Sequence, residues 1–154
     1  MMIKMKKSSV VWVLGFIGLL LSNICVADTL LMARTEQSFP EAMLKLQETI
    51  KNQGYTVSRV QRIDIGLTAS GYQTDKYRVV FFGKHKEITD LSERYPHMIP
   101  YLPLQIAIFA EEEETLLVAA SPRQLEDENY PELNQILEKF EQDMQAIFSA
   151  MRDN

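Results

Sequence analysis

The chain has very little of the side-chain chemistry on which most enzymes and metal proteins depend. Its 154 residues include one cysteine, one tryptophan and two histidines. The cysteine, Cys25, lies in an N-terminal segment that we expect to be removed, so the remaining chain has no thiol, no disulfide and no cysteine ligand for a metal. This composition is suited to an oxidising compartment, and the domain must be stabilised by its hydrophobic core alone.

Motifs that mark common catalytic and nucleotide-binding sites are also missing. There is no Gly-x-Ser-x-Gly elbow, no phosphate-binding glycine loop and no His-Glu-x-x-His pair. Ser70 and Ser121 lie next to small or turn-forming residues, but the sequence shows no base beside either. Nucleophilic catalysis is unsupported rather than excluded, because catalytic partners need only meet in space. We expect no cofactor.

Positive charge is scarce as well. The chain has 16 lysines and arginines against 21 acidic residues, which gives a formal net charge of −5. Binding to nucleic acid depends on lysine and arginine contacts to phosphate, so this composition argues against a nucleic-acid partner. The same acidity disfavours an anionic membrane surface.

Residues 1–27 have the three parts of a secretory signal peptide. Three lysines lie within the first seven residues, and residues 10–21 form an apolar run without charge. Cys25 and Ala27 then place small residues at the −3 and −1 positions of a cleavage site before Asp28. The sequence therefore predicts export and cleavage near Ala27.

Two alternatives to cleavage are open. An uncleaved membrane anchor needs roughly 20 apolar residues to span the bilayer, and this run is shorter. A lipoprotein would be attached through Cys25, but Ile24 stands where lipidation signals carry a small residue. Cleavage leaves one domain of 127 residues, 28–154, with a net charge of −8 because three lysines and no acids are lost. We expect a periplasmic or secreted protein that is not attached to a membrane.

Hydrophobic periodicity predicts five strands and three helices in this domain. The strands are expected at residues 29–35, 55–64, 77–82, 104–109 and 115–120. The helices are expected at residues 39–53, at residues 86–95, and from a cap at Asn129 to about Met151; residues 65–75 are expected to form a loop. The order βαββαββα favours an α+β two-layer sandwich, with a mostly antiparallel five-stranded sheet and helices on one face.

Local patterns support parts of this prediction. Residues 104–109 are rich in β-branched and aromatic side chains without proline, which is typical of a buried central strand. Ser38 with Glu41 forms a capping box at the start of the first helix. Val57 and Val60 have opposite parity, so either both faces of the second strand are partly covered or a bulge lies near Arg59.

Several short motifs follow one another in a specific order. They are Ser38-Phe39-x-Glu41-Ala42, Gly54-Tyr55-x-Val57 leading to Ile63-Asp64, Phe82-Gly83, Leu102-Pro103-Leu104, and Pro122 after the fifth strand. With these motifs the chain resembles the domain-of-unknown-function 302 family over about residues 30 to 150. The resemblance implies a compact two-layer α/β domain that is often dimeric, with no activity established for the family as a whole.

The chain departs from the family pattern at two places. The turn after Phe82-Gly83 often carries a proline where this chain has His85. One branch of the family has Pro-Cys-Asn where this chain has Pro103-Leu104-Gln105. A thiol or cysteine-ligand role in that branch therefore does not transfer to this protein.

We expect an exported domain that binds a small molecule or a protein, with no catalytic activity evident, and a possible homodimer. The candidate surface for the ligand or partner consists of Gly83, His85, His97, Tyr101, Pro103 and Gln105. The tyrosines of this region, such as Tyr101, combine an apolar ring with a polar tip, which suits a pocket rim or an interface as well as ordinary packing beside prolines.

The alternative is a metal-binding protein or an enzyme that uses His85 and His97. These imidazoles, with Glu87 or Glu93, have the ligand types of a zinc or copper site, but their spacing matches no known ligand motif, so we expect no metal. Residues 111–114 are four glutamates that offer oxygen ligands for calcium. They lack the alternation and glycine of a calcium loop, and a solvated hairpin tip is the expected structure.

Export generates a direct prediction. When the full chain is produced in a bacterium and recovered from the exported fraction, N-terminal sequencing is expected to begin at Asp28, because a leader peptidase recognises small residues at −3 and −1. Replacement of Ala27 by a bulky residue, Ala27→Tyr, is expected to block this cleavage. A mature chain that begins at Cys25 and carries lipid would establish the lipoprotein alternative instead.

Overall fold

The computed structural model describes residues 29–152, so the expected leader peptide and its cleavage site lie outside the described residues. The strands are β1 (Leu30–Thr35), β2 (Thr56–Arg62), β3 (Tyr77–Gly83), β4 (Leu104–Glu111) and β5 (Glu114–Ala120). The helices are α2 (Phe39–Asn52), α3 (Ile63–Ala69), α4 (His85–Arg94) and α5 (Pro131–Arg152), with the 3-10 helices η2 (Pro96–Tyr101) and η3 (Pro122–Leu125). Within the described range, every helix is too short or too polar to span a bilayer.

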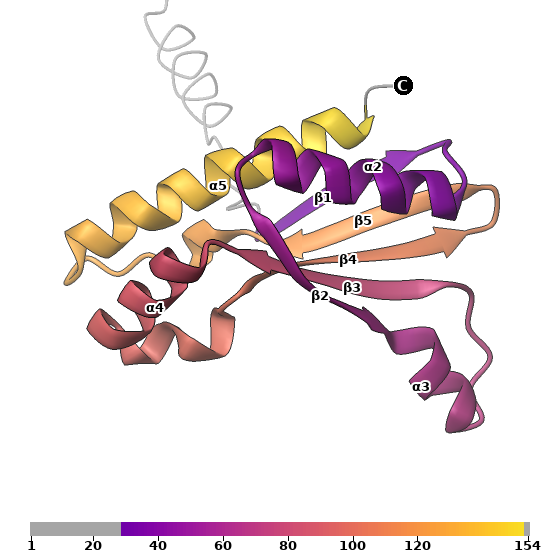
Figure 1. Ribbon diagram of the computed structural model, residues 1–154, viewed down its shortest axis with the longest axis horizontal. Helices are drawn as coiled ribbons and strands as arrows, with labels where there is room; N and C mark the ends of the chain where they lie inside the picture. Colours follow the sequence, from indigo (N-terminus) through magenta and orange to yellow (C-terminus); the bar gives the residue numbers. More distant parts are fainter. Residues whose placement is uncertain (1–28, 153–154) are drawn as a thin grey trace, which may run out of the picture.

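The five strands lie in one sheet, in the order β1-β5-β4-β3-β2, and each neighbouring pair is antiparallel (Figure 1). This confirms the predicted α+β class. The prediction that residues 104–109 form a central strand is also confirmed, because β4 occupies the middle of the sheet. Ile106 and Ile108 on this strand have no exposed surface.

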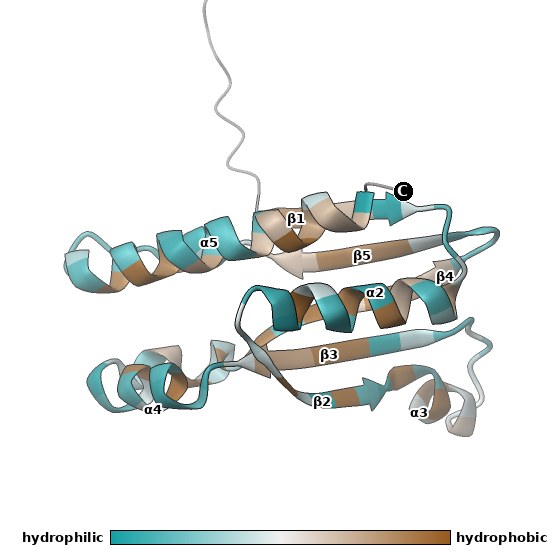
Figure 2. Cartoon of the chain, turned by 45° about the horizontal axis from the view of Figure 1, so that its top comes forward, coloured by the Kyte–Doolittle hydropathy of each residue, from teal (hydrophilic) through white to brown (hydrophobic). Residues whose placement is uncertain are grey.

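Helices α2 and α5 cover one face of the sheet (Figure 1). Both helices show hydrophobic and hydrophilic residues in alternation along their length (Figure 2), which is typical of a helix with one apolar stripe. Burial of the stripes against the sheet removes apolar surface from water, the main stabilising contribution in a domain without cysteine. The largest buried side chains of this core are Leu46, Ile50, Phe82, Ile106, Ile108, Leu117, Met144, Ile147 and Phe148.

A second, smaller group of buried side chains lies beyond the end of the sheet, between α4, η2 and the first half of α5 (Figure 1). Leu104, the first residue of β4, packs against this group and also against the main core. The two hydrophobic groups are therefore joined at the start of β4. The members of the smaller group are Leu91, Tyr95, Met98, Leu133, Leu137 and Phe140.

The bulge expected near Arg59 is present in β2. Val57 pairs with Phe82 and Arg59 pairs with Phe81, so Ser58 is an extra residue on this strand. The extra residue brings Val57 and Val60 to the same face of the sheet. Their opposite parity in the sequence is thus explained by the bulge.

The first turn of α2 has the predicted capping box. The carboxylate of Glu41 accepts hydrogen bonds from the backbone N–H of Ser38 at 3.1 Å and from the Ser38 hydroxyl at 2.6 Å. Both bonds lower the pKa of Glu41, and the bond from the hydroxyl has the larger effect. The negative charge at this position also interacts favourably with the N-terminal end of the helix dipole.

The prediction for residues 55–75 is wrong in part. Strand β2 ends at Arg62, and residues 63–69 form α3 in place of the strand end and loop that we expected. The helix ends in a Schellman motif: Tyr72 N donates to Leu67 O at 3.0 Å, and Gly71 has a φ of 87°. No residue of α3 is buried, so the apolar periodicity that reveals other helices is weak here.

The expected caps and links near the C-terminal helix need two corrections. Asn129 does not cap α5: its side chain donates to Asp127 at 2.7 Å, and the helix begins at Pro131 after Tyr130, whose carbonyl accepts from Asn134 N at 3.0 Å. Proline suits the first helical position because its missing N–H would have no partner there. The link after α4 is also more regular than expected, since residues 96–101 form the 3-10 helix η2.

Candidate functional site

A cavity opens beside Pro103, where β4 begins and β5 ends. We call it the Leu104 cavity; its volume is about 80 Å³. Apolar side chains make most of its wall, and none of its lining residues is charged. The apolar lining includes Met98, Leu102, Leu104, Leu137, Phe140 and Met144, and the polar lining consists of Tyr101, Gln105, Ser121 and Gln124.

Three segments form this cavity. Helix η2 and the following Leu102–Pro103 segment, whose peptide bond is cis, bring Tyr101 over the start of β4. Helix η3 continues from the end of β5 and packs against α5. Leu137, Phe140 and Met144 of α5 supply the apolar wall opposite. The cavity thus lies at the junction of the two hydrophobic groups.

The predicted site residues fall into different places. Tyr101 and Gln105 line the Leu104 cavity, and Pro103 lies between two lining residues. Gly83 is buried and lies outside the lining; a Cβ on it would lie 2.2 Å from Cδ1 of Ile88. Gly83 therefore permits the close approach of β3 to α4, which is a packing role.

The two histidines do not form a pair. His85 begins α4 and His97 follows the end of that helix, and a helix of ten residues is about 15 Å long. The His97 ring instead lies 5.2 Å from the ring of Tyr130 and 6.2 Å from the ring of Tyr95. Among residues 29–152, no group of three or more His, Cys, Asp or Glu side chains is arranged to hold a metal ion.

Sequence reasoning missed the partner of Ser121. The Ser121 hydroxyl donates a hydrogen bond of 2.6 Å to Oε2 of Glu141, and Oε1 of Glu141 accepts from Gln145 at 2.8 Å. Both Ser121 and Glu141 are buried, with 3% and 5% of their surface exposed. Glu141 comes four residues after Leu137 and therefore lies on the apolar stripe of α5. An acidic residue within an apolar stripe was the signal in the sequence that Glu141 would be buried.

The Ser121–Glu141 pair differs from the catalytic arrangement of serine hydrolases. Serine hydrolases place a histidine between the serine and the carboxylate, because a carboxylate alone is a weak base for a hydroxyl. Neither His85 nor His97 lines the Leu104 cavity. The pair places a polar oxygen in a largely apolar wall.

A second polar network joins β2 to α5. The Tyr55 hydroxyl donates to Oδ2 of Asp143 at 2.6 Å, Lys139 pairs with the same oxygen, and the Lys84 ammonium lies 4.4 Å from the centre of the Tyr55 ring. Burial, together with the bond to Asp143, raises the pKa of Tyr55. Burial alone would raise the pKa of Asp143, but the hydrogen bonds from Lys139 and Tyr55 outweigh it and lower that pKa. All members of the network have partners, so its role is to hold α5 on the sheet.

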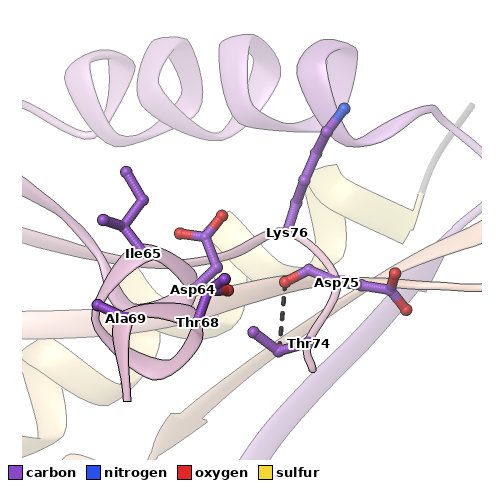
Figure 3. Close-up of a pocket in the computed structure, with 7 residues that line it drawn as sticks. All are labelled: Asp64, Ile65, Thr68, Ala69, Thr74, Asp75 and Lys76. Carbon is purple, nitrogen blue, oxygen red and sulfur yellow. Dashed lines mark hydrogen bonds between the residues drawn. The ribbon is translucent and has the colours of Figure 1, made fainter. Parts of the chain in front are cut away.

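A broader depression of about 470 Å³ lies between α3 and residues 74–76 (Figure 3). The side chains of Asp75 and Lys76 point in different directions there, and Thr74 contacts the Asp75 carbonyl at 3.2 Å. Asp64 is already paired with Arg78 behind it. This depression is shallow and its charged groups do not converge, so it offers no defined site.

The acidic hairpin between β4 and β5 is paired with an arginine side chain. Arg34 of β1 pairs with both Glu111 and Glu114. The guanidinium group compensates part of the negative charge that a calcium ion would need. The solvated tip that the sequence predicted is consistent with the exposure of Glu112 and Glu113.

The Tyr55–Asp143 network generates a prediction about pH. Because the folded state lowers the pKa of Asp143 below its ordinary 3.8, the ionised carboxylate stabilises the fold above that pH, and this contribution is lost as the pH falls through the folded value. Asp143→Asn is expected to reduce the free energy of unfolding by about 1 kcal/mol at pH ~7. At pH ~3 the difference from wild type is expected to shrink.

Urea unfolding at the two pH values measures this difference. Asp90→Asn, at an exposed position on α4, is the control and is expected to change the free energy of unfolding by less than ~0.5 kcal/mol at both. If Asp143→Asn reduced the free energy of unfolding as much in acid as at neutral pH, the stabilising role of the Asp143 charge would be contradicted.

Comparisons with known proteins agree with the architecture. The family model described as "Domain of unknown function DUF302" matches residues 32–151. No significant match is found among curated proteins. The crystal structure of the uncharacterized conserved protein DUF302 from Bacillus stearothermophilus is similar, with a TM-score of 0.73 and 18% sequence identity, over 82% of this chain and 100% of that chain. That likeness establishes the fold, and the family model covers most of the sequence: the chain belongs to the DUF302 family.

Proposed function

We propose that this protein is an exported binding domain without catalytic activity, and that the Leu104 cavity holds a small, largely apolar ligand. The observation that carries the proposal is the cavity itself, an apolar recess with a few polar groups on its wall. Ligand sites commonly have this composition, because apolar contact supplies affinity and a few polar atoms set the orientation.

The size of the cavity limits the ligand. An engineered apolar cavity of about 150 Å³ binds benzene, so a cavity of about 80 Å³ suits a molecule of roughly three to five non-hydrogen atoms, or one end of a longer molecule. Tyr101 is 52% exposed and Gln105 is exposed, which places both at the mouth. A longer ligand would leave the cavity beside these two residues.

A second observation favours a protein partner. Among the described helices, none packs along the face of the sheet opposite α2 and α5 (Figure 1). The register places mostly apolar residues on this face. Leu30 and Met32 on this face are 50% and 46% exposed, and the rings of Tyr77 and Phe109 lie 5.9 Å apart across β3 and β4. We call it the open sheet face; the register assigns to it Leu30, Met32, Tyr77, Val79, Phe81, Ala107, Phe109, Leu116 and Val118.

A second copy of the chain fits this face best. Four strands about 4.8 Å apart and six to eight residues long make a flat patch of roughly 400 Å², and side-chain relief brings its accessible area towards the ~800 Å² that one partner contributes to a standard interface. The apolar members of the patch are bordered by Arg34 and Glu114 at one end and by Arg59 of β2, which pairs with Phe81, at the opposite edge. Two such faces stack as in a β-sandwich around a twofold axis.

The cavity generates a prediction of ligand binding. 1-Propanol, used as a probe, is expected to bind saturably at millimolar concentration and to shift the methyl resonances of Met98, Leu137 and Met144 in protein NMR spectra. Gln124→Phe places a ring in the cavity from an exposed position and is expected to weaken binding at least tenfold.

The matched control is Gln135→Phe, at an exposed position of α5 away from the lining. It is expected to leave the dissociation constant within twofold of wild type. Non-saturable shifts, or equal binding by the two variants, would remove the cavity as the ligand site.

The open sheet face generates a prediction about assembly. Light scattering at micromolar concentration is expected to give the mass of two chains, and Met32→Lys is expected to give the mass of one, because burying an unpaired ammonium in the interface is costly. Leu44→Lys is the control: Leu44 is 70% exposed on α2, outside this face, and its variant is expected to stay dimeric. A wild-type mass of one chain at all concentrations tested would reject the homodimer.

A further inference from the structure

We propose that the Leu104 cavity selects a ligand with a primary ammonium group over one with a carboxylate or phosphate, and that Ser121 and Glu141 make this selection. This inference rests on the proposed function, because it names the chemical class of ligand for the same cavity. It depends on three observations: the direction of the Ser121 hydrogen bond, the burial of Glu141, and the absence of charged side chains from the lining.

The hydrogen bonds of Ser121 leave it as an acceptor towards the cavity. A serine hydroxyl has one proton, and the Ser121 proton is directed at Glu141. The backbone N–H of Ser121 donates to Thr29 O at 2.9 Å, so it is not available to a ligand either. The serine therefore presents only oxygen lone pairs, and a bound molecule must donate the hydrogen bond.

Glu141 adds a negative charge behind this acceptor. The distance of 2.6 Å from Ser121 is typical of a hydroxyl bonded to an ionised carboxylate. Its hydrogen-bond partners, Ser121 and Gln145, are both neutral. A buried carboxylate without a cationic partner is unfavourable, so a cation that enters next to Ser121 removes part of this cost.

An anionic ligand finds no compensation in the same place. The lining contains no lysine, arginine or histidine. A carboxylate in the cavity would meet the lone pairs of Ser121 and the field of Glu141, and like charges at low dielectric repel strongly. The remaining polar groups are the Tyr101 hydroxyl and the side-chain amides of Gln105 and Gln124, and all three residues are at exposed positions.

Three probes with the same propyl chain test the selection: n-propylammonium chloride, 1-propanol and sodium propionate, each titrated into the purified protein at pH 7 and constant ionic strength and followed by protein NMR. We expect propylammonium to bind at least fivefold more tightly than propanol, and propionate at least tenfold more weakly than propanol. Glu141→Gln removes the charge and keeps the shape, and it is expected to bring propylammonium and propanol within twofold of each other.

Glu138→Gln, at an exposed position of the same helix, is the matched control and is expected to preserve the wild-type order. This inference would be overturned if propionate bound as tightly as propylammonium, or if Glu141→Gln kept the wild-type preference for propylammonium. The proposed function would still stand in either case, provided that Gln124→Phe weakens the binding of propanol. Absence of saturable binding for all three probes would overturn both. The wild-type order of the three probes decides the question if Glu141→Gln does not fold.

Discussion

The apolar stripe of α5 is the contact on which the rest of the structure depends. This helix has 22 residues and is therefore about 33 Å long, enough to extend past the end of the sheet. Its second half, with Ile147 and Phe148, is buried against the sheet, and its first half, with Leu133 and Leu137, is buried against α4 and η2. Without α5 the smaller hydrophobic group would have no wall, and the Leu104 cavity would not exist.

A single helical layer has a consequence for the other side of the sheet. An antiparallel sheet tolerates one solvated face when that face is polar. Here the alternating positions of β1 and β3 that point away from the helices include Met32, Val79 and Phe81. The same strands that bury one core therefore carry a second apolar surface, and this two-sided hydrophobicity, in a small domain without disulfides, is the basis of the proposed homodimer.

Most of the fold could be predicted from local patterns because each long element buries one face. The stripe of α2 has a period that identifies a helix, and the apolar runs in β4 and β3, rich in β-branched and aromatic side chains, identify strands. Helix α3 was not predicted because none of its residues is buried. Asn129 was wrongly predicted as a cap, because its side chain donates to Asp127 instead. The structure of such segments depends on individual hydrogen bonds, which hydrophobic periodicity does not predict.

The candidate site shows the same division. The sequence placed Tyr101 and Gln105 on a candidate surface beside the proline-rich link and the central strand, and both residues line the Leu104 cavity. Ser121 was visible, but its partner Glu141 is 20 residues away, and only the packing of α5 against the end of β5 brings them to 2.6 Å. His85 and His97 are the opposite case. They are only twelve residues apart in the sequence, but α4 lies between them and keeps them apart in space.

By itself, the sequence determined the class of the fold, the order of its five strands and three longest helices, and the resemblance to the family, because hydrophobic periodicity and turn motifs are local properties of the chain. The tertiary structure alone decided the strand order, the cavity at the end of β4, the Ser121–Glu141 pair and the open sheet face. These features join residues distant in sequence, and their positions follow from how the helices pack on the sheet, which no local pattern specifies.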